Sequence, residues 1–271
     1  MSDPIFIIGS PRSGTSIFTW CLGQHPNIYP LEETVWFGKC AHGLEAAFRL
    51  GSSRGERSQL SAMGITRDRF FRAFGEAIDG LIREHQTRAA TRVAPGVAFA
   101  RVRSPEDPKG RWIDGTPENS FHVPRLRRLW PEARFIHLVR DGDAVVRSLR
   151  RFSRAGGRDH DADEAYEKWI RHVRACLEAE TEAPGRVLRL YHANLVSNPA
   201  DTIRAALDFV GEPFDEACLL PLGTKINSSG VPETDSPETA PIHPETLAEA
   251  RALGRRLFAD GNALESREAS R

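Results

Sequence analysis

A short segment near the N terminus gathers an arginine, two glycines and several hydroxyl side chains directly after an apolar run. Pro4–Ile8 is typical of a buried strand, and the apolar residues from Ile17 to Leu22 recur at helical spacing. A loop between a strand and a helix offers free backbone N–H groups at the positive end of the helix dipole, where phosphate binds. We therefore assign this loop to an anion, with contacts from Ser10, Pro11, Arg12, Ser13, Gly14, Thr15 and Ser16.

The loop differs from that of nucleoside triphosphatases in the place of its cation. Gly9 and Gly14 have the spacing of such a loop, but Thr15 stands where the lysine belongs. The positive charge lies inside the loop instead, as Arg12. This difference argues against an ordinary ATPase or kinase. A turn without a ligand is the alternative interpretation, but such a turn has little reason to gather these side chains.

A second basic segment follows Arg134–Val139, an apolar run that predicts another strand. Arg140 comes directly after this run, Asp141 is expected to cap the next helix, and Ser148 lies within that helix. Ligands of open parallel sheets bind at the carboxyl ends of the strands, so Arg140 should lie on the same edge as Arg12. Alone, Arg140 fits an ion pair with Asp141 equally well. Together, the two segments predict a ligand with two separated phosphates.

Strands and amphipathic helices alternate along most of the chain. Asn27–Pro30 and Val187–Tyr191 are further strand candidates. The helix after Asp141 is expected to turn Leu149 and Phe152, together with other apolar residues, toward the core. This alternation predicts an α/β fold with a P-loop-like, mainly parallel central sheet flanked by helices.

Composition excludes several other classes of protein. Lys and Arg number 37, as do Asp and Glu, so the net charge supports neither a general nucleic-acid partner nor a membrane-surface binder. The four cysteines form no Cys-x-x-Cys pair and are expected to be free thiols. No apolar run approaches the ~20 residues that cross a bilayer, and no signal-peptide pattern opens the chain. We expect a cytoplasmic protein without a membrane span.

The phosphate-binding segments resemble those of the sulfotransferases that use 3′-phosphoadenosine 5′-phosphosulfate (PAPS). Phe6–Ser16 is similar to their 5′-phosphosulfate loop. Arg140–Ser148 is similar to their 3′-phosphate segment, with the arginine and serine at the family's eight-residue separation. Trp112–Pro117 and Tyr191–Pro199 also match, the latter loosely. The resemblance covers most of residues 4–230.

Because its loop carries an arginine, the chain resembles the branch of the family that contains the tyrosylprotein and several bacterial sulfotransferases. In that branch Glu-Glu-Thr follows the first helix, and this chain has the same residues at 32–34. The match implies that Glu33 is the general base. Asp114, at the end of its own predicted strand, is the rival base. Gly115 stands where many relatives carry the lysine of a Lys-Thr-Pro motif, so any donor contact of that lysine is absent here.

The resemblance implies one domain over 1–271, and two segments of this domain break the alternation of strands and helices. Residues 41–110 would form a mostly helical insertion that binds the acceptor or acts as a lid. The polar segment 222–243 is expected to add a binding loop, although disorder is the alternative for both segments. The residues of this loop assigned to the donor site are Lys225, Ser228, Ser229 and Gly230.

The implied activity is in-line transfer of a sulfuryl group from PAPS to a hydroxyl or amine acceptor, with release of 3′,5′-adenosine bisphosphate (PAP). Such transfer depends on positioning and electrostatics, and no metal is required by this logic. Arg12 would stabilise the leaving 5′-phosphate, Arg140 and Ser148 would hold the 3′-phosphate, and Glu33 would accept the proton. A nucleotide kinase or phosphotransferase and a non-catalytic nucleotide-binding protein are the alternatives.

The acceptor is not specified by the sequence. A small molecule, a glycan and a natural product all fit, and the sequence leaves open whether the chain forms a homodimer. Arginines between residues 49 and 72 could bind an acidic saccharide, but a solvated surface explains them as well.

Overall fold

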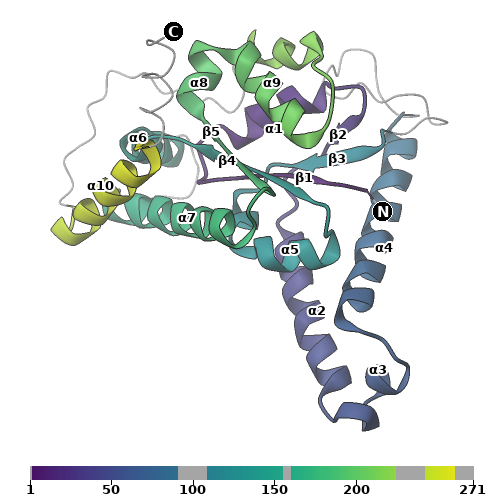
Figure 1. Cartoon of the computed structure of the whole chain (residues 1–271). Helices are drawn as coiled ribbons and strands as arrows, with labels where there is room; N and C mark the ends of the chain where they lie inside the picture. The colour runs from purple at the N-terminus through teal and green to yellow at the C-terminus, as the bar shows by residue number, and fades with distance from the viewer. Residues whose placement is uncertain (1, 91–108, 155–159, 224–241, 260–271) are drawn as a thin grey trace.

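A five-stranded parallel sheet forms the centre of the computed structural model, which describes residues 2–90, 109–154, 160–223 and 242–259 (Figure 1). The strands lie in the order β2-β3-β1-β4-β5, and each pairs with its neighbours in parallel. All their carboxyl ends therefore lie at one edge. The predicted α/β fold with a mainly parallel sheet is confirmed. The strands are β1 (Ile5–Ile8), β2 (Ile28–Pro30), β3 (Arg111–Asp114), β4 (Arg134–Val139) and β5 (Val187–Tyr191).

Helices cover both faces of the sheet (Figure 1). Alternate side chains of a strand point to opposite faces, so β1 buries Phe6 and Ile8 on one side and Ile5 and Ile7 on the other. The first pair packs with α2, α4, α5 and α7, and the second with α1, α8 and α9. The α-helices are α1 (Thr15–Gly23), α2 (Trp36–Ser52), α3 (Gln59–Ala62), α4 (Arg67–Ala90), α5 (Val123–Leu129), α6 (Gly142–Arg154), α7 (Ala162–Glu182), α8 (His192–Ser197), α9 (Pro199–Val210) and α10 (Pro244–Phe258), and the 3-10 helices are η1 (Gly55–Arg57), η2 (Pro117–His122) and η3 (Glu216–Gly223).

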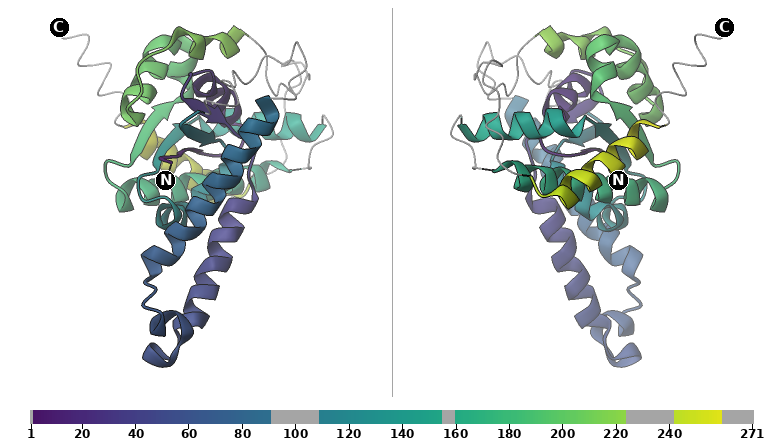
Figure 2. Two further views of the ribbon diagram at one scale, coloured as in Figure 1. Left: turned by 90° about the vertical axis from the view of Figure 1, so that its right-hand side faces the viewer. Right: turned by 90° about the vertical axis from the view of Figure 1, so that its left-hand side faces the viewer.

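The predicted insertion over 41–110 has a different boundary in the structure. Its helical segment begins earlier, with α2 at Trp36, and α2 and α4 extend away from the sheet to a tip formed by η1 and α3 (Figure 2). Asp79 ties α4 to the core, because its Oδ1 accepts hydrogen bonds of 3.0 Å from the indole N–H groups of Trp112 and Trp130. Residues 91–108 lie outside the described part of the chain.

Three further observations concern the cysteines, membrane-spanning helices and metal sites. All four cysteines are free thiols, and Cys21, Cys176 and Cys218 are buried. Within the described ranges, no helix combines the length and the apolar character that a bilayer crossing demands. Within the same ranges, no group of three or more histidine, cysteine, aspartate or glutamate side chains could hold a metal ion.

Candidate functional site

The loop between β1 and α1 turns sharply at the carboxyl edge of the sheet. Arg12 has a φ of 68° and is the one residue other than glycine with a positive φ in the described part of the chain. A residue with a side chain loses about 1–3 kcal/mol in such a conformation. The Ser13 N–H closes the turn by donating to the Ser10 carbonyl at 3.1 Å. No side chain caps the start of α1, so its first N–H groups are available to an anion.

Two hydrogen bonds join this loop to the second predicted anion segment. Arg140 Nη1 donates to the carbonyl of Arg12 at 2.7 Å, and Arg12 Nε donates to Ser148 Oγ at 3.2 Å. The first bond supports the loop at the residue with left-handed backbone. The structure thus brings together Arg12, Arg140 and Ser148, which the sequence assigned to two phosphates of one ligand.

Positive charge is concentrated around these residues. Burial lowers the pKa of Arg12, and the charge of Arg151 lowers it further, while Glu33 opposes both effects. Burial also lowers the pKa of Arg140, with additional contributions from Arg12, Arg151 and Arg147. Guanidinium groups stay protonated at neutral pH despite such shifts. The cluster is therefore charged and mutually repulsive, a condition that a bound polyanion relieves.

His192 borders the same cluster from the start of α8. A Cβ added to Gly14 would lie 2.8 Å from its Cδ2 atom, so the imidazole lies directly against the loop. Burial, together with the charge of Arg140, lowers the pKa of His192 to about 4. The ring is neutral at pH 7 and adds no charge to the cluster.

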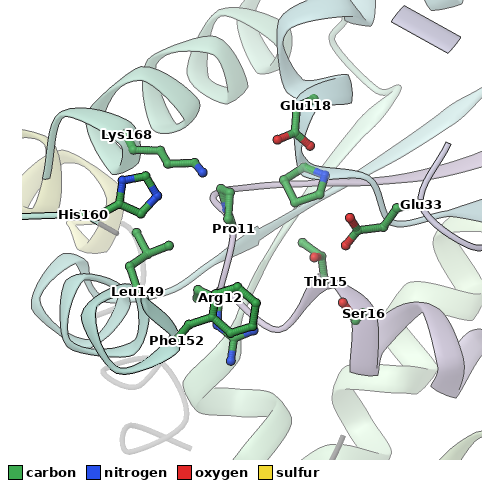
Figure 3. Close-up of a pocket in the computed structure, with 11 residues that line it drawn as sticks. Pro11, Arg12, Thr15, Ser16, Glu33, Glu118, Leu149, Phe152, His160 and Lys168 are labelled. Carbon is green, nitrogen blue, oxygen red and sulfur yellow. The ribbon is translucent and has the colours of Figure 1, made fainter. Parts of the chain in front are cut away.

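A pocket of about 300 Å³ opens beside the loop (Figure 3). Four of the predicted loop residues line it, and so does Glu33, which follows β2. Ser10, Ser13 and Ser148 are buried instead and do not line the pocket. The lining residues are Pro11, Arg12, Thr15, Ser16, Glu33, Pro117, Glu118, Leu149, Phe152, His160 and Lys168.

Glu33 has the environment of a carboxylate that can take up a proton. Its partial burial raises its pKa, and repulsion from Glu118 and Asp114 raises it further, while Arg12 acts in the opposite direction. A carboxyl whose pKa approaches the working pH is a better general base than one with an ordinary value. Because Glu33 also lines the pocket beside the loop, both its place and its environment suit proton transfer.

Asp114 lies in a different environment, at the end of β3. It is fully buried, and it accepts hydrogen bonds from the N–H and the hydroxyl of Thr116 at 2.9 and 2.6 Å, from Asn119 Nδ2 at 2.8 Å and from the Thr34 hydroxyl. Burial raises its pKa, and these hydrogen bonds oppose the increase. Asp114 is not among the lining residues. Of the two predicted carboxylates, Glu33 thus lies at the pocket, whereas Asp114 is buried behind it and is bonded to Thr34, the neighbour of Glu33.

Gly115 is enclosed by α1. A Cβ at this position would collide with Thr19 Oγ1 and would lie 3.3 Å from the Thr15 carbonyl oxygen. A side chain there would first have to displace Thr19, which belongs to the buried side of α1. The chain therefore has no room, in this conformation, for a lysine side chain at position 115.

Several residues that line the pocket were not predicted as site residues from the sequence. Glu118, His160 and Lys168 come from η2, the segment before α7 and α7 itself. The one available signal was that Lys168 is among only four lysines in an arginine-rich chain. Phe152 requires a correction: it was expected in the core, but 43% of its surface is exposed and its ring lies 4.9 Å from Arg12 Cζ.

Two groups of predicted residues do not reach this pocket in the described structure. No residue from 41 to 90 is among those that line it, so the described part of the insertion does not form its wall. Lys225, Ser228, Ser229 and Gly230 lie outside the described residues, and their assignment to the donor stays a prediction.

Comparison with solved structures supports the fold. The chain superposes on a sulfotransferase domain from the Synechococcus PCC 7002 olefin synthase with a TM-score of 0.58 and 22% identity, over 93% of this chain and 95% of that one. A sulfotransferase domain from the curacin biosynthetic pathway gives a TM-score of 0.53 and 18% identity, over 94% and 98%.

Sequence relatives indicate the same family. A putative protein-tyrosine sulfotransferase of Caenorhabditis briggsae is 25% identical over 217 residues, which cover 79% of this chain and 68% of that protein. Protein-tyrosine sulfotransferase 1 of Danio rerio is 26% identical over 217 residues, 79% of this chain but 55% of its own length. The model of the sulfotransferase family matches residues 4–216. The predicted resemblance is confirmed, the kinase alternative is not favoured, and the chain belongs to the sulfotransferase family.

Proposed function

We propose that this chain transfers the sulfuryl group of PAPS to a hydroxyl acceptor, with Glu33 as the general base. One observation carries the proposal: two positively charged sites for anions lie at one edge of the sheet and are joined by hydrogen bonds. Arg12 donates to Ser148, and Arg140 donates to the carbonyl of Arg12. A ligand that satisfies both sites needs two phosphate groups separated by a nucleoside. PAPS has this form, with a phosphosulfate at the 5′ position and a phosphate at the 3′ position.

The residues present fit such a donor. The open start of α1 and the Arg12 guanidinium would hold the 5′-phosphosulfate, and Arg140 with Ser148 would hold the 3′-phosphate. Arg12 Nε donates to Ser148 Oγ in the structure, and this bond does not use the O–H donor of Ser148, which can therefore donate to a 3′-phosphate. The lining positions of Thr15 and Ser16 add hydroxyl donors on the same side.

The reaction needs three tasks from the chain's own residues. Glu33 accepts the acceptor's hydroxyl proton as the oxygen attacks sulfur. Arg12 and the N–H groups of the loop stabilise the electron pair that passes to the 5′-phosphate oxygen when its bond to sulfur breaks. The buried hydrogen bonds of Asp114 to Thr34 and Thr116 keep the Glu33 segment at the edge of the pocket. Positioning of this kind contributes most of the catalysis expected for a loose in-line transfer.

The acceptor belongs to the proposal only by class. The two relatives described above are named as protein-tyrosine sulfotransferases. The pocket combines apolar surface from Leu149 and Phe152 with the carboxylates Glu33 and Glu118. Such a lining accommodates the carbon skeleton around a hydroxyl, and we include a tyrosine peptide as one acceptor among several in the test.

Ligand selectivity tests the donor half of the proposal. PAP at ~100 times its Kd should stabilise the fold by ~2.7 kcal/mol, which raises the Tm of a protein of this size by ~5–10 °C. AMP, without a 3′-phosphate, should give a much smaller increase, and so should ATP with Mg²⁺. Equal increases with AMP and PAP would remove the 3′-phosphate site from the proposal, and a preference for ATP would favour a kinase.

Transfer itself is measured with radiolabelled PAPS. The acceptor panel contains a phenol, a tyrosine peptide, a neutral sugar and an aliphatic alcohol, and labelled product is separated from PAPS. We expect transfer to at least one class. Binding of PAP with no transfer to any acceptor would favour a non-catalytic nucleotide-binding protein.

A further inference from the structure

Position 115 cannot supply a cation to the pocket, and the structure offers another source. Gly115 faces the backbone and side chains of α1, so no side chain there reaches the donor without a shift of Thr19. Among the residues that line the pocket, the lysine and arginine side chains are Arg12 and Lys168. They approach it from different elements, Arg12 from the loop and Lys168 from α7 (Figure 3).

The Arg12 guanidinium is held against α6. Its Nε donates to Ser148 Oγ at 3.2 Å, and the Phe152 ring lies 4.9 Å from its Cζ. The other walls of the pocket carry two carboxylates, Glu33 and Glu118. A sulfuryl group that leaves the loop moves toward these carboxylates while it carries negative charge. A second cation on that side offsets the repulsion, and Lys168 provides one.

Lys168 is also held in register with the donor loop. Its neighbour Trp169 donates from Nε1 to the carbonyl of Arg140 at 3.2 Å, and Arg140 in turn donates to the carbonyl of Arg12. One turn further along α7, His172 Nδ1 lies 2.8 Å from the carbonyl of Lys168. The backbone of Lys168 is therefore fixed relative to Arg12, and its half-buried side chain extends into the pocket (Figure 3).

We propose that Lys168 is a catalytic residue whose ammonium group contacts the sulfuryl oxygens during transfer and supplies the charge that position 115 lacks. This inference rests on the proposed function. The bond between sulfur and the 5′-phosphate oxygen breaks, its electron pair stays on the phosphate, and the acceptor oxygen bonds to sulfur. The acceptor proton goes to Glu33. Lys168 remains protonated throughout and acts by charge alone.

The test compares Lys168→Met, Lys168→Arg and the control Lys39→Met, a change at an exposed lysine of α2 that does not line the pocket. Lys168→Met should lower kcat by about 10²–10³-fold, the range for loss of one charged or hydrogen-bonding contact to the group in transfer. The Kd for PAP should change less than twofold, because PAP has no sulfuryl group. PAPS should lose more affinity than PAP. Lys168→Arg should recover part of kcat, and Lys39→Met should match wild type.

Other outcomes would overturn the proposal. A kcat within threefold of wild type in Lys168→Met would show that the ammonium does not act on the sulfuryl group. A KM increase confined to acidic acceptors, with normal kcat on a neutral phenol, would make Lys168 an acceptor-binding residue. A large loss of Tm and of PAP affinity would make it structural. Absence of transfer in the wild-type protein would instead refute the proposed function and this inference with it.

Discussion

Replacing each carboxylate by the corresponding amide separates the roles of Asp114 and Glu33. Asp114→Asn keeps the shape of a fully buried side chain, and Glu33→Gln makes the same chemical change at the pocket. We expect the first variant to lose stability and the second to lose turnover. Glu32→Gln, at an exposed neighbour outside the pocket lining, is the matched control.

The cost at Asp114 follows from its hydrogen bonds. Oδ1 accepts from the N–H and hydroxyl of Thr116, and Oδ2 accepts from Thr34 and Asn119. An amide nitrogen placed at either oxygen meets donors, and a buried group left unpaired costs about 1–3 kcal/mol. The remaining bonds lose their charge assistance, about 1 kcal/mol more in total. We expect a loss of about 2–4 kcal/mol, or ~4–16 °C in Tm.

Glu33→Gln should behave in the opposite way. Its Tm should stay within about 1 °C of wild type, because surface changes away from buried networks have small effects on stability. Loss of a positioned base should lower kcat by about 10²–10⁴-fold while the Kd for PAP stays nearly constant. In wild type the rate should fall as the pH falls through the raised pKa of Glu33, and this acidic limb should flatten in the variant.

Calorimetry, PAP titration and kcat on one acceptor together decide between the two carboxylates. An Asp114→Asn protein with wild-type Tm and PAP affinity but no turnover, beside an active Glu33→Gln protein, would refute the reasoning and make Asp114 the base. Two stable, active variants would mean that the acceptor is acidic enough to react without a base, or that another residue supplies one.

Two further predictions concern charge. Arg140→Ala should weaken PAP far more than AMP in a titration, since only PAP has the 3′-phosphate, whereas Arg12→Ala should also lower kcat; equal effects on both nucleotides would contradict the assignment of Arg140. His137 of β4 and Glu180 of α7 form a 2.7 Å ion pair. Burial disfavours charge on His137, but Cys176 and Glu180 raise its pKa to about 9, so its contribution to stability is complete below pH 6.5 and disappears as the pH rises through 9. A plot of Tm against pH should show this loss of stability, and the loss should be smaller in His137→Gln. Parallel curves for the two proteins would show that the ion pair does not cause the loss.

Local sequence was sufficient for the elements that form the donor site. β1 and β4 are short, mostly apolar runs buried in the sheet, and β5 is a partly buried run rich in Leu and Val; such runs are readable without tertiary information. The start of the helix after β4 was also readable, because Asp141 Oδ1 accepts from the Ala144 N–H at 2.9 Å, as its residue type predicts. Parallel pairing of β1 and β4 then places Arg12 and Arg140 together.

The rest of the pocket could not be predicted in this way. Lys168, Glu118 and His160 belong to no local motif, and only packing of α7 and η2 brings them to one pocket. Phe152 follows Leu149 at helical spacing, yet Leu149 is buried and Phe152 is exposed beside Arg12, so periodicity alone assigned it wrongly. Likewise, the predicted insertion begins at residue 41, whereas α2 begins at Trp36. Glycines interrupt the helix-forming residues of α2, and tertiary burial of its apolar face outweighs their low propensity.

The different contacts of Arg12 and Arg140 explain why the two arginines should differ in their effect on binding. Arg12→Ala removes a cation and its hydrogen bond to Ser148 Oγ, but it leaves the O–H donor of Ser148 able to bind the 3′-phosphate. The proposed 3′-phosphate site therefore keeps both of its side chains in this variant. Arg140→Ala removes the cation proposed for the 3′-phosphate and also the 2.7 Å bond that supports the left-handed backbone of Arg12. Affinity for PAP should therefore depend more on Arg140, and turnover more on Arg12.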